Sequence, residues 1–370
     1  MATEVSQAKP KPSELRSPPR SQKPTRRRLT HRSEMGALVG MVAVLAFFSI
    51  SGGAKFLSVG GVASWVNVAA ELGIIAVPVG LLMIAGELDL SVGSVLAASS
   101  MTLAIASGYY HAPMIIGILL ALLVGALTGF LNGYITTRTN VSSFVVTLGT
   151  NFGLAGLTLG MSRALTGTTS VSLTPGHFFK SVFGTLLYNG QFEVSVFWCA
   201  GVAIAVSWML QMTPWGNWIF AIGGDKESAR AAGIPVAATK IWLYVLSGLG
   251  AALVGIIQTC LYNGGQTANG QSFVFDSIIA VVIGGVLLTG GYGSVVGMIL
   301  GTLTFAIVNE GIYYTSWNSD WASLILGVLL LAAVILNNTF RQLALHAGNR
   351  GASRTGATKH LENRASTQTN

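Results

Sequence analysis

The sequence predicts an all-α polytopic membrane protein of about ten transmembrane helices with both termini in the cytoplasm. Composition, apolar runs and charge placement each lead to this fold class. Of the 370 residues, 51% are apolar and 9% are charged. A soluble domain carries roughly 25% charged residues, so this chain has too few to cover a water-facing surface. A helix needs roughly 20 apolar residues to cross a bilayer, and such runs recur along the sequence.

Most of the charge lies at the two ends. Twelve charged residues precede Met35 and six follow Asn338, which leaves sixteen between them. We therefore expect a basic, Pro-rich tail over 1–35, a membrane-spanning domain over 36–337, and a second tail over 338–370. Both tails have so few large apolar residues that we expect them to be disordered. The run Arg26–Arg28 suits contact with anionic lipid beside a first span better than contact with nucleic acid.

Ten spans are predicted from the apolar runs between charged, Gly, Pro and Asn clusters. They cover residues 36–53, 66–86, 91–108, 114–136, 142–161, 194–213, 241–262, 276–290, 293–314 and 321–337. The pairs that meet at 86–91 and 290–293 are alternatively broken or re-entrant helices. The loop 162–193 is the longest external one, and its apolar stretch around 178–187 suggests a short interfacial helix.

The distribution of basic residues predicts how the chain is oriented in the membrane. With both termini in the cytoplasm, eighteen Lys and Arg residues face inward, and three (Lys55, Arg163 and Lys180) face outward. The inner set comprises nine in the first tail, five in the second, and Arg138, Lys226, Arg230 and Lys240. The excess satisfies the positive-inside rule.

A short capped helix is predicted on the cytoplasmic side, within 221–235. Asp225 suits its N-cap, and Glu227 favours the positive end of the helix dipole. Gly233 is placed for a left-handed stop, and Pro235 prevents continuation. A compact helix between two long spans can transmit movement from a cytoplasmic motor, or it can be an ordinary connector.

A helix-break motif interrupts the apolar runs near residue 90. Its residues are Gly86, Glu87, Asp89, Ser91, Gly93 and Ser94. Carboxylates at membrane depth usually pair, line a cavity or reach an interface. Three interpretations remain open: a proton- or cation-coupling pair, a break in a discontinuous helix, and an interfacial capping turn built on Asp89 or Ser91.

A candidate translocation path follows this motif. Phe144, Thr147, Thr150 and Asn151 recur at helical spacing and could face a polar route, with Ser142 and Ser143 capping the span. The alternative is hydrogen bonding between helices and close packing of small residues.

The sequence offers no catalytic, metal or cofactor site. The five histidines are scattered, and Cys199 and Cys260 lie inside apolar runs where they suit packing. A phosphate-binding loop of the Gly-Lys-Ser/Thr type is missing, so we expect no ATP on this chain.

Several runs together resemble the ribose/xylose-type ABC sugar permease family, which belongs with the branched-chain amino acid permeases. These runs are Gly86–Val95, Asn132-Gly-Tyr, Phe144–Thr150, Ala221–Asp225, Ala229–Ile234, Ile279–Gly285 and Thr289–Ser294. The resemblance covers roughly 36–337. It departs at Asp225, where Asn is common, at Ser142-Ser143, where prolines are frequent, and at Glu87, which replaces a frequent Gly.

The resemblance implies a permease in a bacterial cytoplasmic (inner) membrane. Its implied partners are a second permease chain (the same or a paired homologue), two cytoplasmic ATPases holding ATP-Mg, and an external solute-binding protein. It also implies that an ATPase-coupling helix comprises Gly224, Asp225, Glu227, Ala229, Arg230, Gly233 and Ile234.

Two functional hypotheses follow. The first is the permease subunit of an ATP-driven importer that carries a small polar solute, a monosaccharide or polyol, and has no enzymatic activity of its own. The second is a secondary transporter or channel driven by an ion gradient through Glu87 and Asp89.

Overall fold

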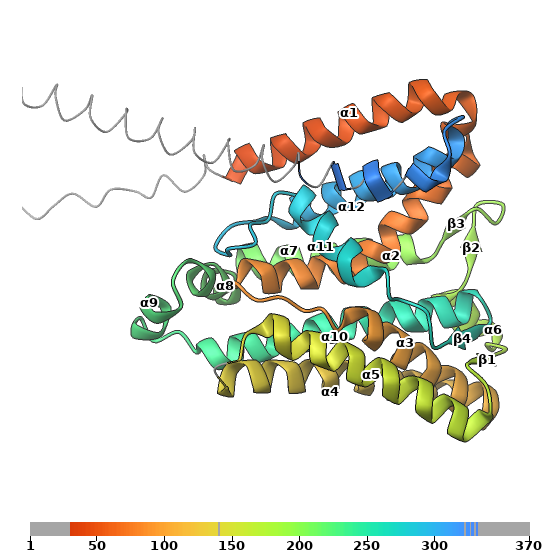
Figure 1. Ribbon diagram of the computed structural model, residues 1–370, viewed down its shortest axis with the longest axis horizontal. Coiled ribbons are helices and arrows are strands. Elements are labelled where there is room, and N and C mark those ends of the chain that lie inside the picture. The colour runs from red at the N-terminus through yellow and green to blue at the C-terminus, as the bar shows by residue number, and fades with distance from the viewer. Residues whose placement is uncertain (1–29, 140, 322, 326, 329–330, 332–370) are drawn as a thin grey trace, which may run out of the picture.

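A computed structural model describes residues 30–139, 141–321, 323–325, 327–328 and 331. The predicted tails 1–35 and 338–370 lie outside these residues, apart from 30–35. Eight of the described helices are long and apolar enough to cross a membrane, which confirms an all-α polytopic membrane protein. Figure 1 shows these helices side by side in one elongated bundle.

The long helices are α1 (Thr30–Phe56), α2 (Val59–Ile84), α3 (Val92–Leu103), α4 (Met114–Arg138), α5 (Ser143–Thr166), α7 (Ser195–Met212), α10 (Val236–Leu261) and α12 (Val295–Gly311). A π-helical turn, η1 (Ala104–Tyr109), extends α3. The short helices are α6 (His177–Phe183), α8 (Pro214–Gly224), α9 (Lys226–Ala231), α11 (Phe273–Ile283), η2 (Ile312–Tyr314) and η3 (Ser319–Trp321). Strand β1 (Ser170–Ser172) pairs antiparallel with β4 (Gly264–Gln266), and β2 (Leu186–Leu187) with β3 (Phe192–Glu193).

Nine of the ten predicted spans have a helix in the structure. The first begins at Thr30 rather than at residue 36, because polar residues can carry a helix on beyond its apolar run. The predicted span 276–290 is instead the 11-residue helix α11. The chain between Ile283 and Ser294 is non-helical and contains five glycines. The tenth, 321–337, lies almost wholly outside the described residues. The predicted external helix is α6, which ends at Phe183 and is followed by β2.

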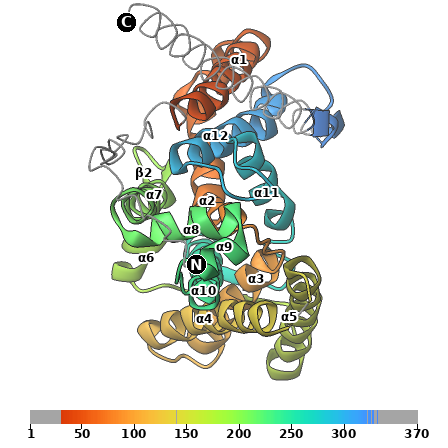
Figure 2. The same ribbon diagram turned by 90° about the vertical axis from the view of Figure 1, so that its left-hand side faces the viewer.

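Helix α10 lies at the centre of the bundle, packed against α2, α3 and α4. Glycines let α4 approach it closely: a Cβ atom at Gly129 would lie 2.3 Å from the carbonyl oxygen of Tyr244. Small residues at helix crossings bring backbones together, which is how helices pack in a bilayer without a strong hydrophobic drive. Helices α7, α11 and α12 surround α2, and α1 lies outermost on α12 (Figure 2).

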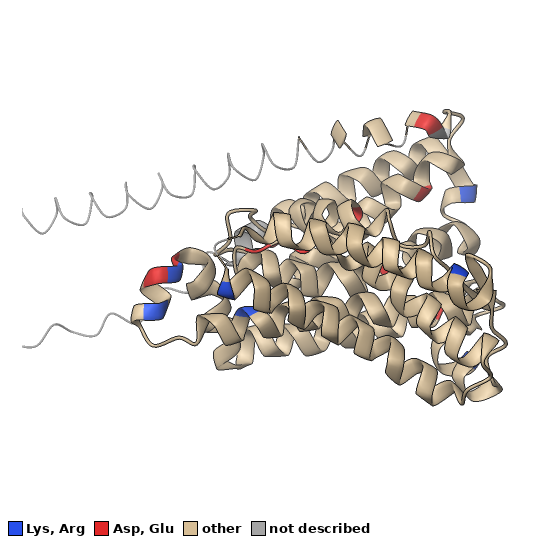
Figure 3. Ribbon diagram, turned by 60° about the horizontal axis from the view of Figure 1, so that its bottom comes forward, with Lys and Arg blue, Asp and Glu red and all other residues tan. Residues whose placement is uncertain are grey.

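The bundle has two distinct ends (Figure 1). At one, which we call the α9 end, helices α8 and α9 project beyond the long helices. At the other, the β1–β4 end, lie both strand pairs and α6. Lys, Arg, Asp and Glu cluster on α9 and are sparse along the bundle (Figure 3). The helices therefore present an apolar surface between two polar ends.

Candidate functional site

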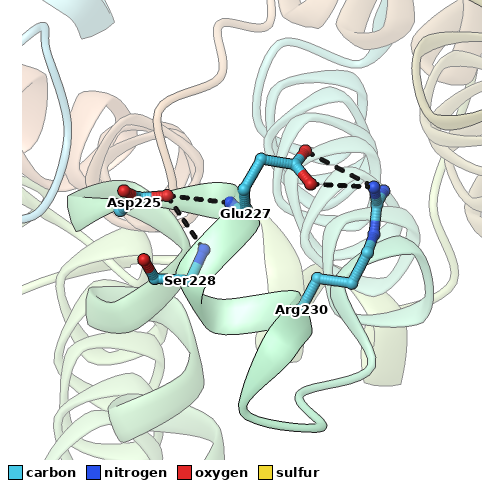
Figure 4. Close-up of polar contacts among 4 residues, drawn as sticks. All are labelled: Asp225, Glu227, Ser228 and Arg230. Atoms are coloured by element: carbon cyan, nitrogen blue, oxygen red, sulfur yellow. Dashed lines mark hydrogen bonds and ion pairs between the residues drawn. The ribbon is translucent and has the colours of Figure 1, made fainter.

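Helix α9 is the capped helix that the sequence predicts. The side chain of Asp225 accepts hydrogen bonds from the backbone N–H groups of Glu227 (2.9 Å) and Ser228 (3.0 Å) (Figure 4). These two amides, that of Ser228 first, lower the pKa of the Asp225 carboxyl below its ordinary value. Arg230 and Glu227 form an exposed ion pair at 3.3 Å. The cap therefore sets where the helix begins, while the ion pair stays open to solvent.

The end of α9 is equally well defined. Gly233 has φ +82°, its N–H donates to the carbonyl of Arg230, and the N–H of Ile234 donates to the carbonyl of Ala229. This pair of bonds is the Schellman motif, which needs a left-handed residue that glycine supplies best. Ala229 is buried and Ile234 packs against the main core. The helix thus turns one small apolar face toward the bundle and its charged face outward.

Helix α8 joins α9 to the bundle through a glycine contact. Gly224, its last residue, is exposed, whereas a Cβ atom at Gly223 would lie 1.7 Å from the carbonyl oxygen of Ile84 and 2.5 Å from the nitrogen of Gly291. The N–H of Gly291 in turn donates to the carbonyl of Ile84 at 2.8 Å. We call the residues Ile84, Gly223 and Gly291 the glycine junction. It holds the end of α2, the end of α8 and the loop before α12 in direct backbone contact.

The helix-break motif follows the end of α2. Gly86 has φ +80° and makes a second Schellman motif: its N–H donates to Met83, and that of Glu87 donates to Leu82. The Glu87 carboxylate is ion-paired with Lys240 of α10, and both side chains are largely buried. The sequence counted Lys240 among the cytoplasmic charges, but the structure places it inside the bundle. It needs a counter-charge there because an isolated buried charge is costly.

Asp89 is almost completely buried and lies at the centre of a polar network. Its Oδ1 accepts from the N–H (2.9 Å) and the hydroxyl (2.6 Å) of Ser91, and its Oδ2 accepts from the hydroxyl of Ser247 on α10 (2.7 Å). Asn132 of α4 donates to the Ser91 hydroxyl (2.8 Å), and Thr150 of α5 donates to Asn132 (2.6 Å). One carboxylate thus joins four helices.

This geometry decides between the structural interpretations of the motif. Asp89 accepts the amide of Ser91, as a capping residue would, and its side chain is buried between helices. The motif is a break between α2 and α3. Ser94 bonds back to the carbonyl of Ser91, and Gly93 allows close approach to Gly270, since a Cβ atom there would lie 2.5 Å from its oxygen.

The candidate path residues on α5 differ in their exposure and in their hydrogen bonds. Phe144 is about half exposed, Thr147 is buried and bonds to the carbonyl of Ser143, and Asn151 is buried with its Oδ1 unpartnered among the described residues. Thr150 bonds between helices, which is the alternative that the sequence left open.

Ser142 is the N-cap residue of α5, as the sequence suggested, but the predicted side-chain capping is not made. Ser142 makes no side-chain cap bond, and the Ser143 hydroxyl instead accepts from the N–H of Leu88 at 3.2 Å. The Ser143 hydroxyl oxygen is therefore occupied by a backbone amide from outside α5 and not by an amide of the first turn of α5.

Sequence reasoning placed none of Asn132, Lys240 and Ser247 in a candidate site. Asn132 lies in one of the runs that carry the family resemblance, and that was the only signal for it. Lys240 and Glu87 are 153 residues apart, so no local pattern pairs them. Among the described residues, no three His, Cys, Asp or Glu side chains gather in a way that could hold a metal ion.

Apolar spans joined by a buried polar network, with a capped helix projecting at one end, define a membrane transport subunit. The model of the family described as branched-chain amino acid transport system / permease component matches residues 61–334. The chain belongs to this permease family. A permease component is a transport subunit and not an enzyme, and it works with a separate ATPase and a solute-binding protein in a membrane transporter.

Curated relatives match most of the chain. The fructose import permease protein FrcC of Rhizobium meliloti is 30% identical, covering 83% of this chain and 86% of the relative. The ribose import permease protein RbsC of Haemophilus influenzae is 30% identical, covering 82% and 93%. The ribose import permease protein RbsC of Bacillus subtilis is 31% identical, covering 82% and 92%.

Proposed function

We propose that this chain forms the translocation path for a monosaccharide or a similar polyol in an ATP-driven importer of a bacterial cytoplasmic membrane. The substrate class is supported by the similar proteins, whose names specify import of fructose and ribose. In this assignment the α9 end faces the cytoplasm and the β1–β4 end faces the solute-binding protein.

The observation that carries the mechanism is the construction of α9. A helix of six residues, capped at its first turn by Asp225 and at its last by Gly233, keeps its shape without neighbours on its outer side. Its exposed Glu227 and Arg230 offer both charges to a docking protein. We infer that this segment, Gly224 to Ile234, docks into the ATPase.

The proposed route of coupling passes through the glycine junction. Gly223 precedes α9 by three residues and contacts the end of α2 and the loop before α12. A displacement of α9 would thus act directly on the two segments where the transmembrane helices are interrupted. The network around Asp89, which starts five residues after Ile84, would move with them.

The proposed assembly contains two permease chains and two ATPases. The exposed apolar surface of helix α5 supports the proposal of a second permease chain, which would cover it. Phe144, Val145, Phe152 and Leu157 are each about half exposed or more. Its Thr147, Thr150 and Asn151 would then lie close to a path between the two chains.

An ion-coupled transporter is not favoured. That hypothesis required Glu87 and Asp89 to bind and release a proton or cation. Glu87 instead has a fixed counter-charge in Lys240, and both oxygens of Asp89 accept hydrogen bonds from serines.

The test is uptake of radiolabelled ribose and fructose by cells that express the complete transporter. Ala229→Pro should abolish uptake while the protein remains inserted, because a proline cannot donate the N–H that bonds to Asp225. Arg230→Glu should reduce uptake, because it reverses a charge on the exposed face of α9 that is proposed to contact the ATPase. Uptake that persists without the ATPase and follows a proton gradient would contradict the importer.

A further inference from the structure

The β1–β4 end contains a polar cavity with a volume of about 440 Å³. Its walls come from β1, from the end of α10 and β4, and from the chain that leads into α11. Strands β1 and β4, which line the cavity, lie at the opposite end of the bundle from α9 (Figure 1). Its size falls within the range of roughly 300–1,000 Å³ typical of sites for small molecules.

The cavity contains side chains with unused hydrogen-bonding groups. Within the described part of the chain, the side-chain amides of Gln266 and Asn269 make no hydrogen bond, although both line the cavity. Each amide can donate twice through nitrogen and accept through oxygen. Tyr262, also in the lining, is 63% exposed. Paired donors and acceptors beside aromatic rings match the alternating hydroxyl and C–H surface of a sugar.

The walls of this cavity are held in place. Gln258 lines it from α10, and its Nε2 donates to Oε2 of the buried Glu71 at 2.8 Å. The strand pair β1–β4 forms a second wall, extended by the N–H of Thr267, which donates to the carbonyl of Thr169. Phe273, the first residue of α11, closes the third side. A site with fixed walls binds without having to order itself first.

Lys180 of α6 fixes the turn beneath the cavity. Its Nζ donates to the carbonyls of Cys260 (2.7 Å) and Leu261 (3.0 Å), at the end of α10, and to Oδ1 of Asn263 (3.0 Å). Asn263 has φ +57°, a conformation that side-chain bonding helps to stabilise. A charged side chain thus holds the segment that links Tyr262 to Gln266.

We propose that this cavity is an entry site that binds a single monosaccharide as it leaves the solute-binding protein. Gln266 and Asn269 hold the hydroxyl groups, and Tyr262 and Phe273 cover the apolar face of the ring. The inference rests on the proposed function, because it takes the solute to be a sugar. It adds that the permease itself recognises the sugar before translocation.

The binding experiment uses the full chain in lipid nanodiscs and saturation-transfer NMR. The probes are D-ribose, D-fructose and myo-inositol, with L-leucine as the probe that is not a sugar. The test variant is the double substitution Gln266→Leu/Asn269→Leu, which keeps side-chain size and removes both amides. The matched control is Gln271→Leu, an exposed position in the same loop that does not line the cavity.

We expect transfer to at least one sugar with the wild type and with Gln271→Leu, and about tenfold weaker binding by the double variant, since two hydrogen bonds are lost. Unchanged binding by the double variant overturns the proposal. So does wild-type protein that shows transfer to no sugar, or to L-leucine alone.

Uptake by the complete transporter separates the two proposals. The double variant should raise the KM for the sugar without lowering the amount of inserted protein. If the wild type imports ribose or fructose and the double variant does so with the same KM, the entry site is wrong and the proposed function stands. If the wild-type transporter imports none of the sugars, the proposed substrate class itself fails.

Discussion

A lysine lies at each end of α10, and the two lysines have different kinds of partner. Lys240, near the first turn, is buried and pairs with the carboxylate of Glu87. Lys180 approaches the last turn from α6 and donates to two backbone carbonyls and one side-chain oxygen. A buried cation needs a full counter-charge, whereas a partly exposed one is satisfied by the negative end of a helix.

This difference separates two mechanical roles. At the α9 end the ion pair, the Asp89 network and the glycine junction fix the helices to one another. At the β1–β4 end the polar groups lie in loops. Two of them, Gln266 and Asn269, line a cavity without a side-chain hydrogen bond to any described residue. In the proposed mechanism, the α9 end transmits displacement and the β1–β4 end receives the solute. The following substitutions test that contrast along α10.

Lys240→Met should have the largest effect. It leaves Glu87 charged and largely buried without a partner, which costs about 3–5 kcal/mol of the free energy of unfolding. Thermal unfolding of the purified protein in detergent measures the loss. Adding Glu87→Gln should restore most of the stability, because the unpaired charge is then gone. Equal unfolding temperatures for the single and double variants would show that the pair does not hold this end together.

Gly129→Leu tests the middle of α10. A Cβ atom here would lie 2.3 Å from the carbonyl of Tyr244, so α4 must move away at a cost of about 1–3 kcal/mol. Gly201→Leu on α7 is the control, because a Cβ atom there meets nothing within 4 Å. Unfolding temperatures should fall for the first and stay constant for the second. If both fall alike, the glycines of α4 have no special packing role.

Lys180→Met tests the far end. Losing a charged donor to the carbonyls at a helix C-terminus should cost about 1–2 kcal/mol and loosen the turn at Asn263. Lys226→Met, on the exposed face of α9, is the control and should leave stability unchanged. Hydrogen exchange of residues 260–266 should accelerate only in the first variant. Unaltered exchange there would contradict the role of Lys180.

Asp225→Ala should change stability least and activity most selectively. The lowered pKa means that the cap is fully present above the ordinary carboxylate pKa and is lost as the pH falls through the lowered value. Sugar-stimulated ATP hydrolysis by the assembled transporter should fall in Asp225→Ala. Asp225→Asn keeps a capping oxygen and should keep activity. Because an amide does not titrate in this range, its cap should not be lost as the pH falls. Full activity of the alanine variant would show that the cap is dispensable.

Local chemistry allowed much of this molecule to be predicted. Apolar runs located the spans, because crossing a bilayer imposes a length. Asp225 and Gly233 bounded α9, because capping depends on residues three to four positions apart. Span 276–290 was misplaced because apolar residues continue past Ile283, where a Schellman turn at Gly285 ends the helix.

The tertiary partners could not be predicted in this way. Glu87 and Lys240, or Asp89 and Ser247, meet because helices far apart in sequence cross. Glycines recur along both α4 and α5, yet Gly125, Gly129 and Gly133 of α4 contact α10, whereas a Cβ atom at Gly149 or Gly153 of α5 would meet nothing within 4 Å. The spacing of glycines predicts that a helix can pack closely. Only the three-dimensional structure shows which helix it packs against. Ser143 illustrates the same limit, since a distant amide occupies the oxygen expected to cap α5.

The glycine junction has a consequence for how faithfully force is passed on. Side chains between two moving parts can change rotamer and absorb part of a displacement. At Ile84, Gly223 and Gly291 the contacts are between backbone atoms, so no such slack exists. A shift of α9 by a given distance should therefore reach the ends of α2 and α12 nearly undiminished. In the proposed coupling, substitutions of exposed side chains around the junction should therefore leave the transmitted displacement unchanged.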